Sequence, residues 1–84
     1  MRQRLACPCC GFLTLGDLPP RSYEICEVCF WEDDPRQFEN PDSDDGANGI
    51  SLQEARENFE GYGASAPEYL RSVREPRRDE ILMI

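Results

Sequence analysis

The chain has 84 residues, a net charge of −8 at pH 7, five cysteines and no histidine. At this length we expect one domain, with a core small enough to need support from a metal or a disulfide. The absence of histidine excludes a Ser-His-Asp triad and any zinc site that uses imidazole. All nine basic residues are arginine, which also excludes a Schiff-base or P-loop lysine.

The whole net charge lies in the middle third of the chain. Residues 1–31 and residues 61–84 are each neutral, whereas residues 32–60 carry ten acids against two arginines. A protein that grips nucleic-acid phosphates is normally basic, so the charge argues against that role. It favours a basic protein partner.

The sequence predicts neither a secretory signal nor a membrane span. Arg2 and Arg4 are followed almost at once by Cys7 and Pro8, which leaves no apolar h-region. No apolar run approaches the roughly 18 residues that a span requires. We therefore expect a cytoplasmic protein, in which cysteines are metal ligands or catalysts rather than disulfides.

The first 31 residues are predicted to form a four-cysteine zinc ribbon. Residues 12–15 and 22–25 have strand-like patterns beside the cysteines, and residues 16–21, with Gly and two Pro, form the turn between them. Residues 32–50 are rich in Asp, Asn, Pro and Gly and are predicted to be an acidic loop. Within it, Asn48 and Gly49 form a tight turn.

Residues 51–84 are predicted to be a helical appendage with an apolar tail at residues 81–84. Ser51 and Glu54 make a capping-box pattern, and a glycine at 61 or 63 ends the first helix. A second helix begins at Ser65 and ends before Pro76. The tail is predicted to complete the core or add a strand, and an exposed anchor for another chain is the alternative. The expected fold class is small α+β: zinc-ribbon-like β-hairpins with rubredoxin-type knuckles, followed by two short helices.

Two C-x-x-C pairs, separated by fifteen residues, predict a metal site. Its expected ligands are Cys7, Cys10, Cys26 and Cys29. Four thiolates close a tetrahedral shell and leave no position for a catalytic water, which predicts a structural Zn²⁺. Iron in the same ligands, as in a rubredoxin, is the alternative.

Cys9 lies between two expected ligands and should face away from the ion. It is interpreted as a small apolar filler. The alternatives are a redox or regulatory thiol and a shifted register in which Cys9 is itself a ligand.

The acidic middle carries the candidate partner-binding residues. These are Phe30, Trp31, Glu32, Asp33, Asp34, Asp42, Asp44 and Asp45. A solvated acidic loop with Trp31 in the core is the simpler interpretation. A carboxylate catalytic pair or a second metal site is the functional alternative. Residues 42–49 resemble a calcium loop, but neither possible register places Asp, Gly and Glu as an EF-hand requires. We therefore interpret them as turns.

Four arginines near the C-terminus alternate with acids. They are Arg71, Arg74, Arg77 and Arg78. Because the neighbouring carboxylates cancel their charge, a helix surface with ion pairs is favoured over a phosphate-binding patch.

Several motifs together resemble a known family. They are CPCCGF at residues 7–12, YEIC at 23–26, VCFWEDD at 28–34, NGISL at 48–52, and EAR with NF up to residue 59. The chain resembles, over about residues 5–63, the bacterial family of small proteins named for its cysteine-rich CPCC motif. The resemblance implies a zinc-ribbon-like knuckle fold with a helical appendage. It implies no particular activity.

These observations predict a zinc-stabilised interaction protein that is not an enzyme. Its acidic surface would meet a basic protein, and an inhibitor or immunity-type protein against a nuclease is one concrete form. A nucleic-acid-associated zinc ribbon, a rubredoxin-like redox protein and an enzyme using Glu32, Asp33 and Asp34 are the alternatives.

Overall fold

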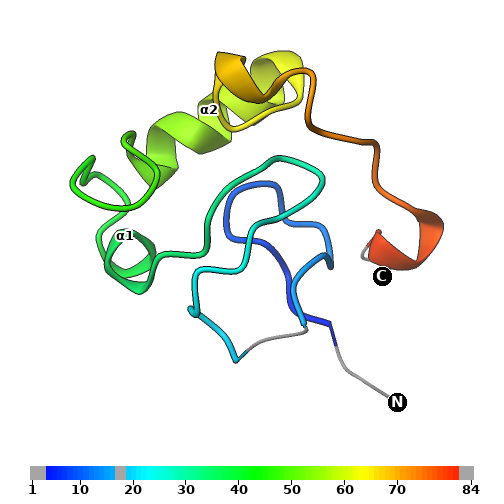
Figure 1. Ribbon diagram of the computed structural model, residues 1–84, viewed down its shortest axis with the longest axis horizontal. Coiled ribbons are helices and arrows are strands. Elements are labelled where there is room, and N and C mark those ends of the chain that lie inside the picture. Colours follow the sequence, from blue (N-terminus) through cyan, green and yellow to red (C-terminus); the bar gives the residue numbers. More distant parts are fainter. Residues whose placement is uncertain (1–3, 17–18, 82–84) are drawn as a thin grey trace.

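The computed structural model describes residues 4–16 and 19–81. In chain order it contains α1 (Pro35–Glu39), α2 (Leu52–Tyr62) and two 3₁₀ helices, η1 (Pro67–Tyr69) and η2 (Arg78–Glu80). Figure 1 shows α2 above the looped N-terminal half, with the segment after η1 descending beside it to η2. Within the described ranges, no helix is long and apolar enough to cross a membrane.

The predicted α+β zinc ribbon is wrong, because the described residues contain no β-strand. Two isolated bridges take its place, one between Leu5 and Leu15 and one between Ile25 and Glu32. The N-terminal half is therefore a set of hydrogen-bonded turns rather than a pair of β-hairpins. Together with the missing second helix, this makes the fold one of loops and short helices.

Local backbone geometry explains why the two predicted strands do not form. In residues 12–15, the N–H of Thr14 donates to the carbonyl of Phe12 at 2.9 Å, which bends the chain within the run. In residues 22–25, Tyr23 has a φ of 67°, a left-handed conformation that interrupts an extended strand. The apolar alternation was present in the sequence, but tertiary contacts override it.

The first predicted helix is confirmed as α2. The Ser51 hydroxyl accepts a hydrogen bond from the N–H of Glu54 at 3.0 Å, so Ser51 is the N-cap. The helix ends at Gly63, whose φ of 87° gives the left-handed C-cap that glycine adopts without strain. Of the two glycines proposed as the stop, Gly63 is therefore the one that acts.

The second predicted helix, from Ser65 to Pro76, is wrong. Ser65 is buried, and its N–H donates to the carbonyl of Cys29 at 2.8 Å, so this residue is held against the second cysteine pair. Only the single turn η1 follows, and no side chain caps it. Further on, the N–H of Arg74 donates to the carbonyl of Glu27 at 3.2 Å, which draws the chain alongside the cysteine turn instead of into a helix.

The predicted acidic loop contains a short helix, α1. The carboxylate of Asp34 caps it by accepting from the N–H groups of Arg36 and Gln37, and Pro35 occupies the first turn. Gln37 is fully buried, and its amide donates to the carbonyls of Ser43 and Ile50 at 2.9 and 2.7 Å. This buried amide orders the loop that follows.

Asn48 and Gly46 complete the packing of this loop. The Asn48 side chain pairs with the backbone of Glu32 in both directions, at 2.8 and 2.9 Å, and also donates to the Gln37 amide oxygen. Gly46 passes so close that a Cβ there would lie 2.7 Å from side-chain atoms of Asp34 and Gln37. The predicted turn at Asn48 and Gly49 is present, with a φ of 74° at Gly49.

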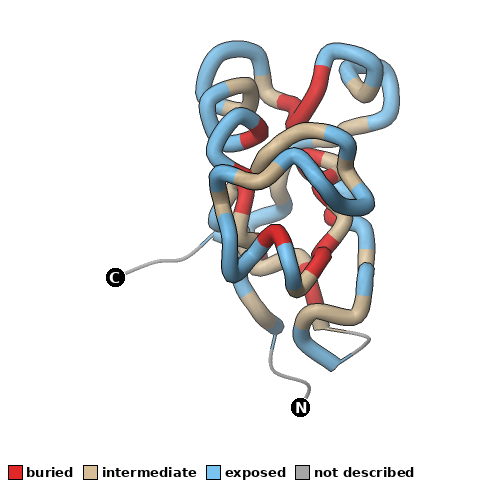
Figure 2. The backbone as a smooth tube through the Cα atoms, turned by 90° about the vertical axis from the view of Figure 1, so that its left-hand side faces the viewer, coloured by how far each residue is buried: buried red, intermediate tan, exposed pale blue. Residues whose placement is uncertain are grey.

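Figure 2 marks the buried segments of the chain, and the hydrophobic core contains four of the five cysteines. Its largest member is Trp31, which is 1% exposed. The other buried members of the cluster are Cys7, Cys9, Leu15, Cys26, Val28, Cys29, Leu52 and Ala55. Ile81, the first residue of the apolar tail, is 41% exposed, so it does not complete this core. The rest of the predicted tail lies outside the described residues.

Candidate metal centre

Four sulfur atoms converge at the centre of the molecule. Their residues are Cys7, Cys10, Cys26 and Cys29, and all four Sγ atoms lie within 4.8 Å of one another. The Sγ atoms of Cys7 and Cys29 are 3.6 Å apart, and those of Cys10 and Cys26 are 3.7 Å apart. All of these cysteines are free thiols. The structure thus brings together the four residues predicted as metal ligands.

The two cysteine pairs lie on turns with the same hydrogen bonds. In the first turn, the N–H of Gly11 donates to the carbonyl of Cys7 at 2.8 Å, and Gly11 has a φ of 82°. In the second turn, the N–H of Phe30 donates to the carbonyl of Cys26 at 2.7 Å, and Phe30 has a φ of 69°. Each C-x-x-C pair is therefore followed by a residue in the left-handed conformation, which glycine adopts without strain and phenylalanine does not.

Phe30 is held in this conformation by its surroundings. Its ring lies against the ring of Tyr69, with centroids 5.3 Å apart. The next residue, Trp31, is fully buried, and its backbone N–H lies 3.4 Å from the sulfur of Cys29. The second cysteine turn is thus fixed by packing on η1 and by the tryptophan anchor that follows it.

The sulfur positions fit a tetrahedral metal ion. With metal–sulfur bonds near 2.3 Å, a regular tetrahedron places its sulfurs roughly 3.8 Å apart. The two pairs at 3.6 and 3.7 Å are close to that value. A bound ion would close its shell with four thiolates, so it would hold the two turns together without offering a site to a substrate.

Hydrogen bonding among the thiols shifts their pKa values in opposite directions. Bonding to the thiols of Cys10 and Cys26 raises the pKa of Cys7, and bonding to Cys26 and Cys29 raises the pKa of Cys10. The pKa of Cys26 is lowered, because Cys26 accepts hydrogen bonds, first from Cys10.

Thr14 is a neighbour of the cluster that sequence reasoning missed. Its hydroxyl donates to the sulfur of Cys26 at 3.0 Å, a hydrogen bond that would persist to the thiolate if a metal ion were bound. Thr14 lies in a segment predicted to be a strand, where threonine is common, so its type and position carried no separate signal.

Cys9 is not one of the converging sulfurs. It is 8% exposed and belongs to the hydrophobic core cluster beside them. The predicted register of the first pair, with Cys7 and Cys10 as ligands, is thus the one in which four sulfurs come together.

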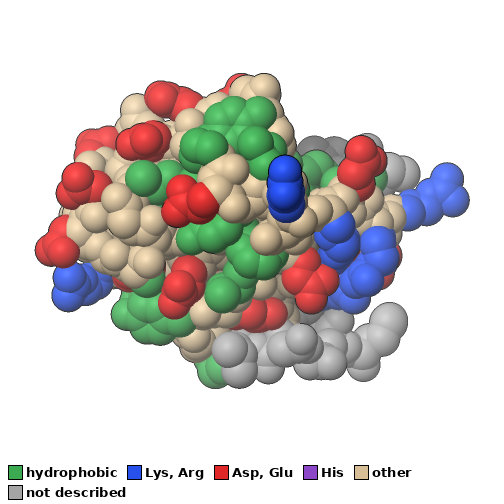
Figure 3. Space-filling view, turned by 45° about the horizontal axis from the view of Figure 1, so that its top comes forward, with side chains coloured by type: hydrophobic (Ala, Val, Ile, Leu, Met, Phe, Trp, Pro, Cys, Tyr) green, Lys and Arg blue, Asp and Glu red, His purple; other side chains and the backbone are tan. Residues whose placement is uncertain are grey.

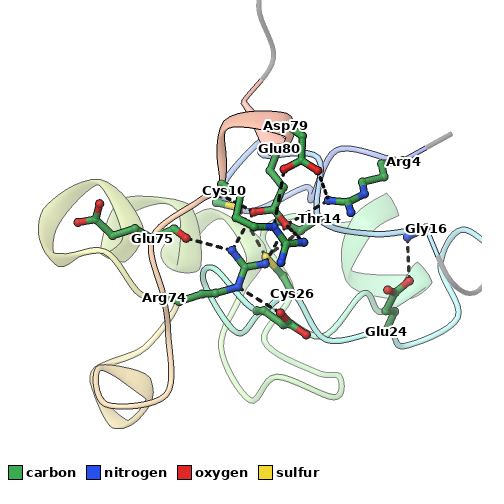
Figure 4. A network of polar contacts seen from close by, with 12 residues as sticks. Arg4, Cys10, Thr14, Gly16, Glu24, Cys26, Arg74, Glu75, Asp79 and Glu80 are labelled. Carbon is green, nitrogen blue, oxygen red and sulfur yellow. Dashed lines mark hydrogen bonds and ion pairs between the residues drawn. The ribbon is translucent and has the colours of Figure 1, made fainter. Parts of the chain in front are cut away.

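A network of ion pairs lies beside the cysteine cluster and connects the C-terminal segment to the rest of the chain (Figure 4). The guanidinium of Arg74 donates to both carboxylate oxygens of Glu80 at 2.8 Å, and its Nε donates to Glu27 at 3.1 Å. Glu80 is 1% exposed and also accepts from the N–H of Arg77 at 2.8 Å and from Arg4 at 3.3 Å. The prediction that ion pairs engage these arginines is confirmed for Arg74 and Arg77, although neither lies on the predicted helix.

The residues proposed to bind a partner divide into buried and exposed groups. Trp31, Asp33 and Asp34 are buried. Asp33 forms an ion pair with Arg21, and Asp34 caps α1 and accepts from the N–H of Ala47. Burial raises the pKa of Asp34, but these backbone hydrogen bonds outweigh it and leave the pKa lowered.

The remaining acids of this group are accessible. Asp42, Asp44 and Asp45 are exposed, and Glu32 and Phe30 are half-buried. The three carboxylates that follow Trp31 therefore do not form one exposed cluster.

Comparison with known proteins identifies the family of the chain. The family model described as Cysteine-rich CPCC matches residues 5–80, a span that begins before the first cysteine pair and ends at Glu80. The chain belongs to this family. Among curated proteins, none matches the chain.

Proposed function

We propose that this member of the cysteine-rich CPCC family is a protein-binding module, stapled by one structural zinc ion and using an acidic surface. The observation that carries the proposal is the set of four converging sulfurs in a chain whose net negative charge is confined to one segment. Zinc fits because a shell of four thiolates has no open position and zinc needs no redox partner. The bound ion would join the two cysteine turns.

The acidic surface consists of exposed carboxylates on two adjoining segments. We call it the acidic face, and its members are Glu39, Asp42, Asp44, Asp45, Glu54, Glu57 and Glu60. The segments adjoin because the N–H of Gln53, in the first turn of α2, donates to the carbonyl of Pro41 at 3.0 Å.

The balance of charge on these segments favours a basic partner. Seven acids face two exposed arginines, Arg36 and Arg56. Figure 3 shows several acidic side chains on the left of the view, with hydrophobic and other side chains between them. Complementary charge of this kind speeds association and selects basic partners, such as a nuclease that the protein would inhibit.

Two measurements on one purified sample test the proposal. Elemental analysis should find one zinc per chain in a colourless protein, whereas visible absorbance from iron would contradict the choice of metal. The immobilised protein should then retain a purified basic nuclease at low salt and release it at moderate salt. The triple variant D42N/D44N/D45N should weaken this retention, and unchanged retention would contradict the role of the acidic face.

A further inference from the structure

An apolar groove lies between the end of α2 and the segment that follows η1. It encloses about 400 Å³. One wall is formed by Phe59 and Tyr62 of α2, and the other by Val73 and Pro76. Tyr62 is 40% exposed, so the groove opens to solvent along the helix. Figure 3, which brings α2 toward the viewer, shows apolar side chains in the middle of this face.

The floor of the groove is built by the two cysteine turns. Phe12 follows the first turn directly, and its ring meets the ring of Phe59 edge-on, with centroids 6.2 Å apart. Val28 lies inside the second turn, between two metal ligands, and is 1% exposed. A metal ion that fixes the two turns therefore also fixes the floor of the groove.

The rim of the groove is negative. Glu75 lines it directly. Desolvation, followed by the charges of Glu54 and the exposed Glu68, raises the pKa of Tyr62 on the wall of the groove. Arg74 also lines the groove, but its guanidinium is already bonded to Glu80 and Glu27. Glu75 is therefore the carboxylate that lines the groove, and the lining Arg74 is already paired.

We infer that this groove binds a short basic segment of a partner protein, anchored by one bulky apolar side chain. The apolar side chain would lie between Tyr62 and Val73, over the floor made by Phe12 and Val28. Lysine or arginine residues on either side of it would reach the carboxylates of the rim. This inference rests on the proposed function, which supplies a basic protein partner, and it assigns the place and the chemistry of the contact.

The chemistry of the groove distinguishes it from the acidic face. The exposed acids at residues 42–45 attract any polycation, because they offer charge without an apolar surface. The groove offers both, so it should require an apolar anchor as well as positive charge.

Fluorescence anisotropy with a short labelled peptide tests this requirement on the zinc-loaded full chain. The probe carries leucine and phenylalanine in the middle with two lysines on either side. One control peptide replaces the two apolar residues by serine, and the other replaces the lysines by glutamate. We expect saturable binding of the probe and at least tenfold weaker binding of each control, in line with roughly 1.4 kcal/mol per tenfold change.

Paired variants locate the binding site. Val73→Ser should weaken binding of the probe by about tenfold through lost apolar contact, whereas Leu70→Ser, which changes an exposed residue outside the groove, should leave it unchanged. The double variant E68Q/E75Q should weaken binding by roughly three- to tenfold at low salt. The double variant D42N/D44N removes the same charge elsewhere and should have a smaller effect.

Three outcomes would overturn the inference. Equal binding of the probe and the serine control would show that charge alone attracts the peptide. The proposed role of the acidic face would then stand, and the proposed role of the groove would be wrong. Equal effects of E68Q/E75Q and D42N/D44N would do the same. A dimer that Val73→Ser converts to a monomer would assign the groove to a second copy of this chain.

Discussion

The variant Glu80→Gln removes the charge on which the ion-pair network converges. Glu80 is 1% exposed and accepts hydrogen bonds from Arg74, Arg77 and Arg4, while its own carbonyl accepts from the N–H of Leu13 at 2.7 Å. The network therefore ties the end of the described chain to its beginning and to the second cysteine turn. Glutamine keeps the shape of the side chain and loses the charge.

The size of the effect follows from the pKa of Glu80. Hydrogen bonds from Arg74, followed by the backbone N–H of Arg77, lower this pKa from 4.5 to about 2. At about 1.4 kcal/mol per pKa unit, the ionised carboxylate contributes about 3 kcal/mol to the free energy of unfolding. That is a large part of the roughly 5–15 kcal/mol expected for a small domain.

Denaturant unfolding at saturating zinc measures this contribution. Glu80→Gln should lower the free energy of unfolding by about 3 kcal/mol at pH 7. Asp79→Asn is the matched control, because Asp79 is the neighbouring residue and faces Arg4 and Arg77 at 3.6 and 3.7 Å but is 63% exposed. Exposed pairs of this kind contribute about 0–1 kcal/mol. Equal losses in the two variants would refute the reasoning from burial.

The pH dependence of the same difference gives a second check. Because the pKa of Glu80 is lowered on folding, its contribution is present above the unfolded value of 4.5 and is lost as the pH falls toward about 2. The difference between wild type and Glu80→Gln should therefore stay constant from about pH 8 to pH 5.5 and shrink below pH 4.5. A difference that already changes between pH 8 and pH 6 would mean that another group is responsible.

Four further predictions concern the metal centre, the loop after α1 and helix α2. Cys26→Ser should unfold the chain, since structural zinc contributes roughly 10–16 kcal/mol in small peptides, whereas Cys9→Ser should keep one metal ion per chain. Circular dichroism measures the folding and elemental analysis measures the metal content. A folded Cys26→Ser protein would contradict the structural role of the metal. Thr14→Val should keep the fold and lower zinc affinity by about tenfold in a chelator competition, because it removes the hydrogen bond to the Cys26 sulfur. Gly46→Ala should destabilise by about 1–3 kcal/mol in denaturant unfolding, because its Cβ meets side-chain atoms at 2.7 Å. Gly61→Ala, which meets nothing within 4 Å inside α2, should instead stabilise by about 0.5–1 kcal/mol.

The convergence of the four cysteines could be predicted from the sequence because the geometry within each pair is local. Two thiols three residues apart on one tight turn converge whatever the rest of the chain does, and Gly11 is the residue that such a turn favours. The second turn shows the limit of that rule, since Phe30 takes the same left-handed conformation without being glycine. Its stacking on Tyr69, a contact across the fold, has no counterpart in the local sequence.

The strands and the second helix could not be predicted, because contacts distant in sequence decide them. Residues 65–75 have the caps and the apolar spacing of a helix. Yet the N–H groups of Ser65 and Arg74 bond to the carbonyls of Cys29 and Glu27, so this segment follows the second cysteine turn. Propensity is a weak prior against such competition. Helix α1 is the opposite case, because Asp34 followed by Pro35 is an N-cap pattern that its lack of apolar spacing obscured.

The structure separates the acids of the middle segment into buried and exposed carboxylates. Asp33 and Asp34 account for two of the ten acids in the middle segment, but they serve the interior, one paired with Arg21 and one capping α1. Within this segment Glu32 is half-buried, and the fully exposed acids begin at Glu39. The buried amide of Gln37 and the half-buried amide of Asn48 hold the loop that displays them. A partner would thus meet carboxylates on an ordered scaffold, which lowers the entropy that binding must overcome and favours selection by position as well as by charge.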